Sequence, residues 1–348
     1  MKKELNDKIR QFGAKSILFN TESLFKALKG IHKRRDIEDI HDIRVASRRI
    51  RAHLAVFATY FPDKKTEKWL KVIRSITKAY GSTRDLDVQI NFLKGFYEGI
   101  NDNTIRSGIR RILLRLKQKR KKLQEKVQIK ADEIKNSPVL EEMVTSLKPL
   151  AEPSPDQEKF SQPLFQLAFD TIHSRLDEFL FYEVFLFHPE KVKELHLMRI
   201  AAKNLRYSLE IFTPLYFGKI EPFLEVTRNT QQTLGDIRDC DIWIQTLPNF
   251  IKKERQFTID YYGYARPFNR LLPGFQFLKQ SQKKQRNNLY EDFINQWRKW
   301  RKQETWLNLR ELILESTLQT ALNTSNTIEK KLKNSQETKQ KSNTHQAT

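Results

Sequence analysis

Residues 41–57 combine apolar and basic positions with the period of an α-helix. On an ideal helix one side is apolar, consisting of Ile43, Ala46, Ile50, Leu54 and Phe57. The other side is basic within an arc of about 80° and consists of His41, Arg44, Arg48 and Arg51. Surface helices usually mix acidic and basic residues at i and i+4, which relieves repulsion, whereas this side carries only basic residues. The pattern predicts a helix with one buried face and one face that binds an anion.

The same pattern starts again 155 residues later, at residues 196–212, and six of the seventeen positions are identical. The second basic side consists of His196, Arg199, Lys203 and Arg206, and we call the two sets the first and second columns. The second apolar side consists of Met198, Ala201, Leu205, Leu209 and Phe212. The alternative is that the two basic faces are alike by chance and only carry cations that extend into water. A matching order of His, Arg, cation and Arg instead favours a duplicated anion-binding helix.

A second segment is also repeated. Val72-x-Arg74-x6-Gly81-x2-Arg84-Asp85-x-Asp87 matches Val226-x-Arg228-x6-Gly235-x2-Arg238-Asp239-x-Asp241. Gly81 is typical of a helix end followed by a new helix. We expect four arginines to be secondary contributors to anion binding: Arg74, Arg228, Arg84 and Arg238. The aspartates could form an acid/base or metal set, but no nucleophile accompanies them, so we expect helix capping and ion pairs with arginine.

The whole pattern predicts an all-α protein made of two homologous halves, each a helical bundle. Other expected helices cover residues 5–35, 67–80 and 104–136, a stretch starting at Leu164, and 280–316. We expect the first half at 1–150, a linker rich in proline at 151–163, the second half at 164–315, and a polar tail at 316–348 whose composition favours disorder. The matching columns favour halves that face each other across a shared basic groove, related by pseudo-twofold symmetry.

The amino-acid composition limits the kinds of partner that the protein can bind. The net charge is +22, with 64 Lys and Arg against 42 Asp and Glu, which favours nucleic acid, an anionic membrane surface or a polyphosphate as partner. No run of eighteen uncharged apolar residues exists, so we expect no membrane span. The start of the chain lacks the apolar region of a signal peptide. Cys240 is the single cysteine, which excludes an internal disulfide and a cysteine-based metal cluster. We therefore expect a cytoplasmic protein.

Together, the four repeated segments resemble the CHAD domain, the conserved histidine α-helical domain, over about residues 5–310. The resemblance implies two four-helix bundles around a basic channel that binds inorganic polyphosphate. It also makes an association with polyphosphate granules an expectation. Some family members carry a triphosphatase domain with a Glu-x-Glu-x-Lys motif, which this sequence lacks. Enzymatic activity is therefore not expected, and neither is a cofactor.

Several alternatives remain open from the residues. His41 and His196 could be metal ligands, but neighbouring arginines raise the cost of adding another cation. Nucleic acid is the main alternative partner; it would satisfy the charge, yet no helix-turn-helix, RNA-binding sheet or zinc signature is found. A phosphohydrolase would need a nucleophile or a metal set that the sequence does not show. We expect the eight column residues to bind polyphosphate without catalysis and without a metal.

Overall fold

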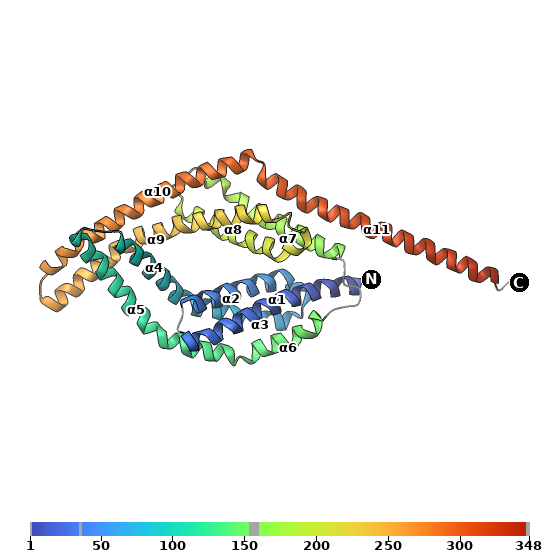
Figure 1. Ribbon diagram of the computed structural model, residues 1–348, viewed down its shortest axis with the longest axis horizontal. Helices are drawn as coiled ribbons and strands as arrows, with labels where there is room; N and C mark the ends of the chain where they lie inside the picture. Colours follow the sequence, from blue (N-terminus) through green and yellow to red (C-terminus); the bar gives the residue numbers. More distant parts are fainter. Residues whose placement is uncertain (1, 35–36, 153–159, 346–348) are drawn as a thin grey trace.

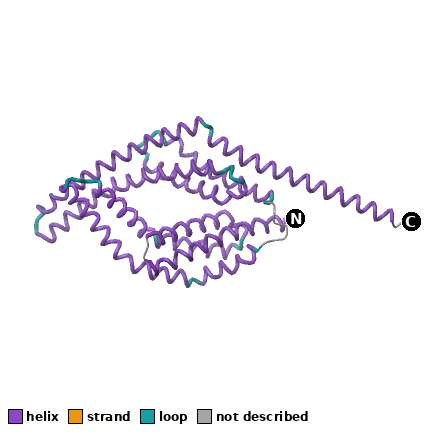
Figure 2. Tube along the Cα trace, in the orientation of Figure 1, coloured by secondary structure: helices purple, strands orange, loops and turns teal. Residues whose placement is uncertain are grey.

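The described part of the chain is almost entirely helical. The computed structural model describes residues 2–34, 37–152 and 160–345, and these ranges contain α-helices and short 3-10 helices but no strand (Figure 2). The all-α prediction is confirmed. The long helices are arranged in two layers that meet at both ends of the body, and the last helix extends away from it (Figure 1).

The first bundle contains four helices that pack on one another: α1 (Lys2–Arg34), α2 (Ile37–Phe57), α3 (Asp63–Ala79) and α6 (Pro138–Ala151). Pro62 directly precedes α3 and Pro138 is the first residue of α6, positions at which a helix does not use the backbone N–H that proline lacks. The apolar faces turn inward, so that Trp69, Leu140 and Met143 are fully buried. This burial supplies the main stabilising term of the bundle.

The second bundle is built from helices of the other half: α7 (Gln162–Leu180), α8 (Val192–Phe212), α9 (Glu221–Tyr262), α10 (Leu272–Lys302) and α11 (Thr305–His345). In its core, the ring centroid of Phe179 lies 5.6 Å from that of Trp297 and 5.1 Å from that of Trp306. Both tryptophans are buried, so they stabilise the core and offer no stacking surface.

A third group of helices projects from the body, and we call it the distal arm (left in Figure 1). It combines α4 (Gly81–Glu98) and α5 (Asn103–Lys135) with the end of α9 and the start of α10. Its separate apolar core includes Leu93 and Ile112 from the first half and Leu247 and Phe275 from the second. The two halves therefore share one core in the distal arm.

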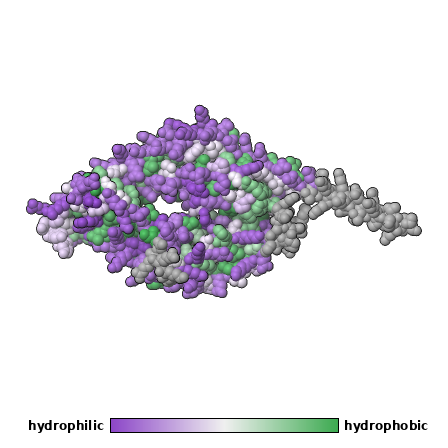
Figure 3. All heavy atoms as spheres, viewed as in Figure 1, coloured by the Kyte–Doolittle hydropathy of each residue, from purple (hydrophilic) through white to green (hydrophobic). Residues whose placement is uncertain are grey.

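At the opposite end of the groove, four phenylalanines join the halves again. The Phe12 ring lies 6.0 Å from Phe57, 6.1 Å from Phe160 and 6.3 Å from Phe212, measured between centroids. Phe57 and Phe212 occupy equivalent positions of the repeated segments, and their own rings are 6.3 Å apart. Between this aromatic junction and the distal arm, an opening separates the two bundles (Figure 3).

The structure differs from the sequence-based expectations in three places. Helix α9 is continuous through Gly235, whereas a turn at Tyr80 separates α3 from α4. Helix α6 ends at Ala151 and α7 begins at Gln162, so helix covers both ends of the expected linker 151–163, and its residues 153–159 lie outside the described ranges. Helix α11 continues to His345, although the composition favoured disorder from residue 316. No glycine or proline follows Gly274, and Lys, Glu and Gln are good helix formers, which explains the helix. The division into halves stays a prediction.

Candidate anion-binding groove

The two columns belong to α2 and α8, helices that contact each other and lie on the facing sides of the two layers (Figure 1). The apolar residues on the opposite side of each helix are all buried: Ile43, Ala46, Ile50, Leu54, Phe57, Met198, Ala201, Leu205, Leu209 and Phe212. The eight column residues themselves are half-buried. Each helix therefore fixes the direction of its column through the packing of its other face.

Lys203 shows how close the columns come. Its pKa is lowered to about 8, first by burial and then by four guanidinium groups: Arg51, Arg199, Arg48 and Arg206. Two of these arginines belong to α2 and two to α8, so the cations repel one another across the groove. An anion between the columns would remove this repulsion, because it favours the charged form of every side chain around it.

One arginine of each column lies against a glycine of the second repeated segment. A Cβ atom added to Gly81 would be 2.9 Å from Nη1 of Arg44, and a Cβ atom added to Gly235 would be 3.2 Å from Nε of Arg199. Any larger residue would force the guanidinium to move. The glycines therefore leave room for these side chains, a role that the sequence alone did not indicate.

Arginines of the second segment extend both columns at the histidine end. The pKa of His41 is lowered by burial and then by Arg84, and that of His196 by burial and then by Arg238. Low hydration and nearby cations thus favour neutral imidazoles in the absence of a ligand. Arg84 and Arg238 therefore lie beside the columns, and their contribution to anion binding stays a prediction.

Aspartates of the second segment orient arginines. Asp85 lies 3.8 Å from Arg44. The buried Asp87 accepts a hydrogen bond of 2.7 Å from Arg120, and the buried Asp241 accepts one of 2.7 Å from Arg286. Three of the four aspartates thus form arginine ion pairs of the expected kind, whereas the expected capping is not found at α4, which begins after Tyr80 without a side-chain cap.

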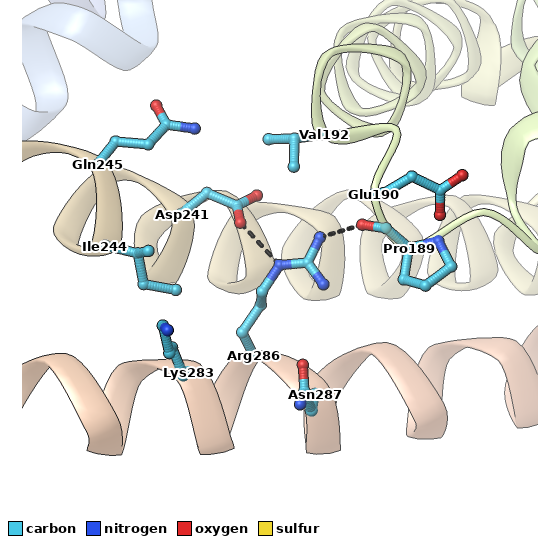
Figure 4. Close-up of a pocket in the computed structure, with 9 residues that line it drawn as sticks. All are labelled: Pro189, Glu190, Val192, Asp241, Ile244, Gln245, Lys283, Arg286 and Asn287. Atoms are coloured by element: carbon cyan, nitrogen blue, oxygen red, sulfur yellow. Dashed lines mark hydrogen bonds and ion pairs between the residues drawn. The ribbon is translucent and has the colours of Figure 1, made fainter.

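Figure 4 shows the second of these buried pairs in a pocket of about 430 Å³. The Arg286 guanidinium lies between Asp241 and the carbonyl oxygen of Pro189, to which it donates a second hydrogen bond of 2.5 Å. Arg286 therefore fixes the loop before α8 to α9 and α10. Sequence reasoning missed Arg286, because it lies 45 residues from its partner and outside both repeats.

Arg206 is more constrained than its counterpart in the first column. It donates hydrogen bonds to Gln231 at 2.8 Å and to Glu210 at 2.5 Å, and Glu210 also lies 3.5 Å from Arg49 of the other half. Its guanidinium also stacks on Tyr207, 4.7 Å from the ring centroid. Within the described residues, Arg51 forms no ion pair, and it lines a pocket between the bundles.

A pocket of about 500 Å³ lies between the bundles and is lined by residues of α2, α3, α7 and α8. Arg48, Arg51 and Arg74 all line it, so the structure brings Arg74 together with the first column. Arg228, the equivalent of Arg74, instead forms a 2.5 Å ion pair with Glu225 and is exposed. Of the four predicted secondary residues, only Arg74 lines this pocket, and no residue of the second column does.

Several buried nitrogens of the columns lack a hydrogen-bond partner among the described residues. They are Nε of Arg44, Arg48 and Arg199 and Nδ1 of His196. A buried donor without a partner costs free energy, which a ligand with acceptor oxygens recovers. Within the described ranges, no group of three or more His, Cys, Asp and Glu is suited to hold a metal ion.

Comparison with known proteins agrees with this geometry. The sequence matches the CHAD domain family over residues 17–248, which includes both columns and both copies of the second segment. The chain belongs to the CHAD domain family. A comparison with curated protein sequences found no match.

Two solved structures are similar to this CHAD chain. PptA from Streptomyces chartreusis has a TM-score of 0.55 at 15% identity, covering 83% of this chain and 99% of the other. The CHAD domain from the plant Ricinus communis has a TM-score of 0.49 at 20% identity, covering 80% and 86%. At this identity, the likeness to PptA concerns the fold alone.

Proposed function

We propose that this chain binds inorganic polyphosphate in the groove between α2 and α8 and catalyses no reaction on it. The observation that carries the proposal is Lys203, whose pKa is lowered to about 8 by burial and by arginines of both columns. Such a concentration of cations is unfavourable without a ligand and favourable around a polyanion. Arginine forks match phosphate oxygens in geometry, and lysine adds a point charge. Membership of the CHAD family supports the same ligand.

Polyphosphate fits the groove better than nucleic acid does. Single-stranded nucleic acids are usually held by aromatic side chains on which bases stack, in addition to cations. The columns consist of basic residues and histidines only, and the aromatic side chains on the opposite faces of α2 and α8, Phe57 and Phe212, are buried. A ligand that is all phosphate needs nothing but charge and donors, which is what the two columns supply.

A non-catalytic role agrees with the acidic residues of the groove. Asp87 and Asp241 are buried in ion pairs with arginines, so neither is placed to activate a nucleophile. Asp85 faces Arg44. We expect polyphosphate and ATP to remain intact with the purified protein, with or without Mg²⁺. Phosphate release that disappears on Asp85→Asn would contradict this part of the proposal.

Binding of labelled polyphosphate at increasing salt concentrations tests the proposal. Each neutralised phosphate adds roughly 0.7–0.9 to the slope of log K against log salt by analogy with nucleic acids, so we expect a steep slope. Arg74→Ala should weaken binding, whereas the matched control Arg228→Ala should not, because Arg74 lines the pocket beside Arg48 and Arg51, while Arg228 is exposed and paired with Glu225. In competition at equal phosphate concentration, polyphosphate should displace single-stranded DNA and RNA. Preferred binding of RNA, or a flat salt dependence, would overturn the proposal.

A further inference from the structure

Most of the net charge of the chain lies in the distal arm. Within the arm, residues 90–122 and 243–286, which include its apolar core, carry 19 Lys and Arg against 4 Asp and Glu. This excess of +15 is about two thirds of the net +22 of the whole chain. One of the four acidic residues, Glu254, is buried in ion pairs with Arg111 and Arg115 and adds no negative potential of its own. The arm therefore presents a strongly positive surface beyond the columns of the groove.

Aromatic side chains are exposed at the end of this arm, where α9 ends (far left in Figure 1). We call Phe257, Tyr261, Tyr262 and Tyr264 the tip cluster. Their exposed fractions are 55%, 80%, 53% and 57%. The rings of Tyr261 and Tyr262 lie 4.7 Å apart, and those of Tyr262 and Tyr264 lie 6.4 Å apart. Four neighbouring aromatic residues that face water serve no purpose in the packing of the arm.

Local geometry holds the tip cluster outward. Phe257 and Tyr261 are one helical turn apart and share a face of α9. Gly263, with a φ of 77°, ends the helix in a left-handed conformation that glycine adopts readily and turns the chain toward Tyr264. Arg115 from α5 lies over the Phe257 ring at 5.1 Å, and the exposed Arg266 and Arg270 follow directly in the chain. One cation thus lies against a ring of the tip cluster, and two exposed cations follow the cluster within six residues of the chain.

We propose that the tip cluster and the cations around it dock on an anionic phospholipid surface. Tyrosine is enriched at membrane interfaces, where its ring enters the headgroup layer while its hydroxyl stays hydrated. Lysines and arginines beside such rings are attracted by the negative potential of anionic lipids. Among the described residues, no helix has the length and apolarity needed to cross a bilayer, so the contact is peripheral.

A membrane fits the tip better than a nucleic acid does. The tip is the protruding end of a helical arm, whereas strands of nucleic acid are usually followed along a positively charged groove. The apolar Phe257 ring is stabilised when it enters the acyl boundary of a bilayer, where no polar group of its own has to be desolvated. Docking through the arm also leaves the groove between α2 and α8 free, so both surfaces can be occupied together.

Vesicle binding by the full chain tests the proposal. We expect sedimentation with vesicles of phosphatidylcholine and phosphatidylglycerol, and little with phosphatidylcholine alone. The double variant Phe257→Ser with Tyr261→Ser should weaken the binding by about tenfold or more, because the rings no longer insert. Arg266→Ser with Arg270→Ser should weaken it by a similar factor. Both variants should bind polyphosphate like the parent chain, which shows that they fold.

The matched control is Phe181→Ser with Val184→Ser, a pair of exposed apolar residues in the short 3-10 helix after α7. This control should bind anionic vesicles like the parent chain. Equal binding to neutral and anionic vesicles, or full binding by the tip variants, would overturn the proposal. Binding of single-stranded RNA that the tip variants lose, without any binding to vesicles, would assign the tip to nucleic acid instead and would also overturn it.

Discussion

Lys203 should report on the proposed binding of an anion, because its charge is unfavourable in the free protein. With a pKa of about 8 in the free protein, it is largely neutral above that pH. A bound polyanion favours the protonated form and raises the pKa. Binding at about pH 8.5 should therefore take up protons, and the affinity should fall as the pH rises through 8. Calorimetry in buffers with different ionisation enthalpies measures the uptake.

Lys203→Arg is the control for proton uptake, since arginine stays protonated throughout this range. The variant should bind polyphosphate at pH 8.5 without taking up a proton at this site. His41 and His196 contribute little at that pH, because their pKa values are already lowered from 6.5. An uptake that is unchanged in Lys203→Arg would show that another group titrates.

The same lowered pKa predicts that Lys203 destabilises the folded chain. Below pH 8 the lysine is charged in both the folded and the unfolded state, so the folded state carries the full cost of the buried charge. Between pH 8 and 10.5 only the unfolded state holds the proton, and the free energy of unfolding therefore rises with pH. Lys203→Met should therefore increase the free energy of unfolding by about 1–2 kcal/mol at pH 7. The gain should shrink toward pH 10. Thermal unfolding at several pH values measures it, and a destabilised variant at pH 7 would contradict the prediction.

Substitutions of Gly81 and Gly235 should weaken anion binding without lowering the stability of the fold. Alanine is the better helix former by about 0.5–1 kcal/mol, so Gly235→Ala should leave the melting temperature unchanged or higher. Its Cβ atom would nevertheless displace Arg199, as the Cβ atom of Gly81→Ala would displace Arg44. We expect both variants to bind polyphosphate several-fold more weakly. Gly95→Ala is the control, because nothing lies within 4 Å of its Cβ position; equal affinities in all three would contradict the role of the glycines.

At the scale of the elements, the crossing of α5 and α10 is the most sensitive point of the distal arm. A Cβ atom on Gly108 would lie 2.4 Å from the carbonyl oxygen of Leu271, and one on Gly274 would lie 2.2 Å from that of Ile105. Backbone atoms cannot yield as a side chain can, so Gly108→Ala should cost about 1–3 kcal/mol or more in unfolding free energy. The neighbouring Ser107→Ala should cost little. Chemical denaturation of both variants measures the difference.

The sequence predicted the helices well where apolar spacing and proline give a clear signal. The helix expected at 104–136 is α5, and the helix expected at 41–57 is α2. It did not predict the distal arm, because Leu93 and Phe275 meet only in the folded chain and nothing local indicates the contact. The continuation of α9 through Gly235 was missed for a similar reason. A single glycine is compatible with a helix interior as well as with a helix end.

At the scale of the whole molecule, the proposed site combines two columns that the sequence identified separately. Helical spacing could show that each column is basic on one side and apolar on the other, and the burial of Ile50 and Leu205 agrees with that. Spacing could not show which cations approach one another across the groove, since this depends on how the bundles pack. The aromatic junction at one end and the distal arm at the other hold the halves in place. The groove between them is therefore a property of the complete fold.

A double-mutant cycle across the groove tests whether the columns face each other. Among the charged groups that lower the pKa of Lys203 on α8, Arg51 on α2 has the largest effect. Arg51→Met and Lys203→Met each remove one side of this repulsion and keep an unbranched side chain of similar length. Once one of the two charges has been removed, removing the other no longer relieves their mutual repulsion. The double variant should therefore gain less unfolding free energy than the sum of the single variants, by about 0.5–1 kcal/mol at low salt. High salt should reduce this coupling, because mobile ions screen the repulsion.

The same cycle, measured as affinity for polyphosphate, connects the repulsion to function. Each single variant should lose about 1–3 kcal/mol of binding free energy, since each removes a charged donor to the same anion. Thus the variants that gain stability should be those that lose affinity, which is expected where a site is strained in the absence of its ligand. Arg51→Met combined with Arg228→Met is the control pair; its effects on stability should add within about 0.5 kcal/mol, because Arg228 is paired with Glu225 on an exposed surface. Strict additivity for Arg51 and Lys203 as well would mean that the two columns act as separate sites.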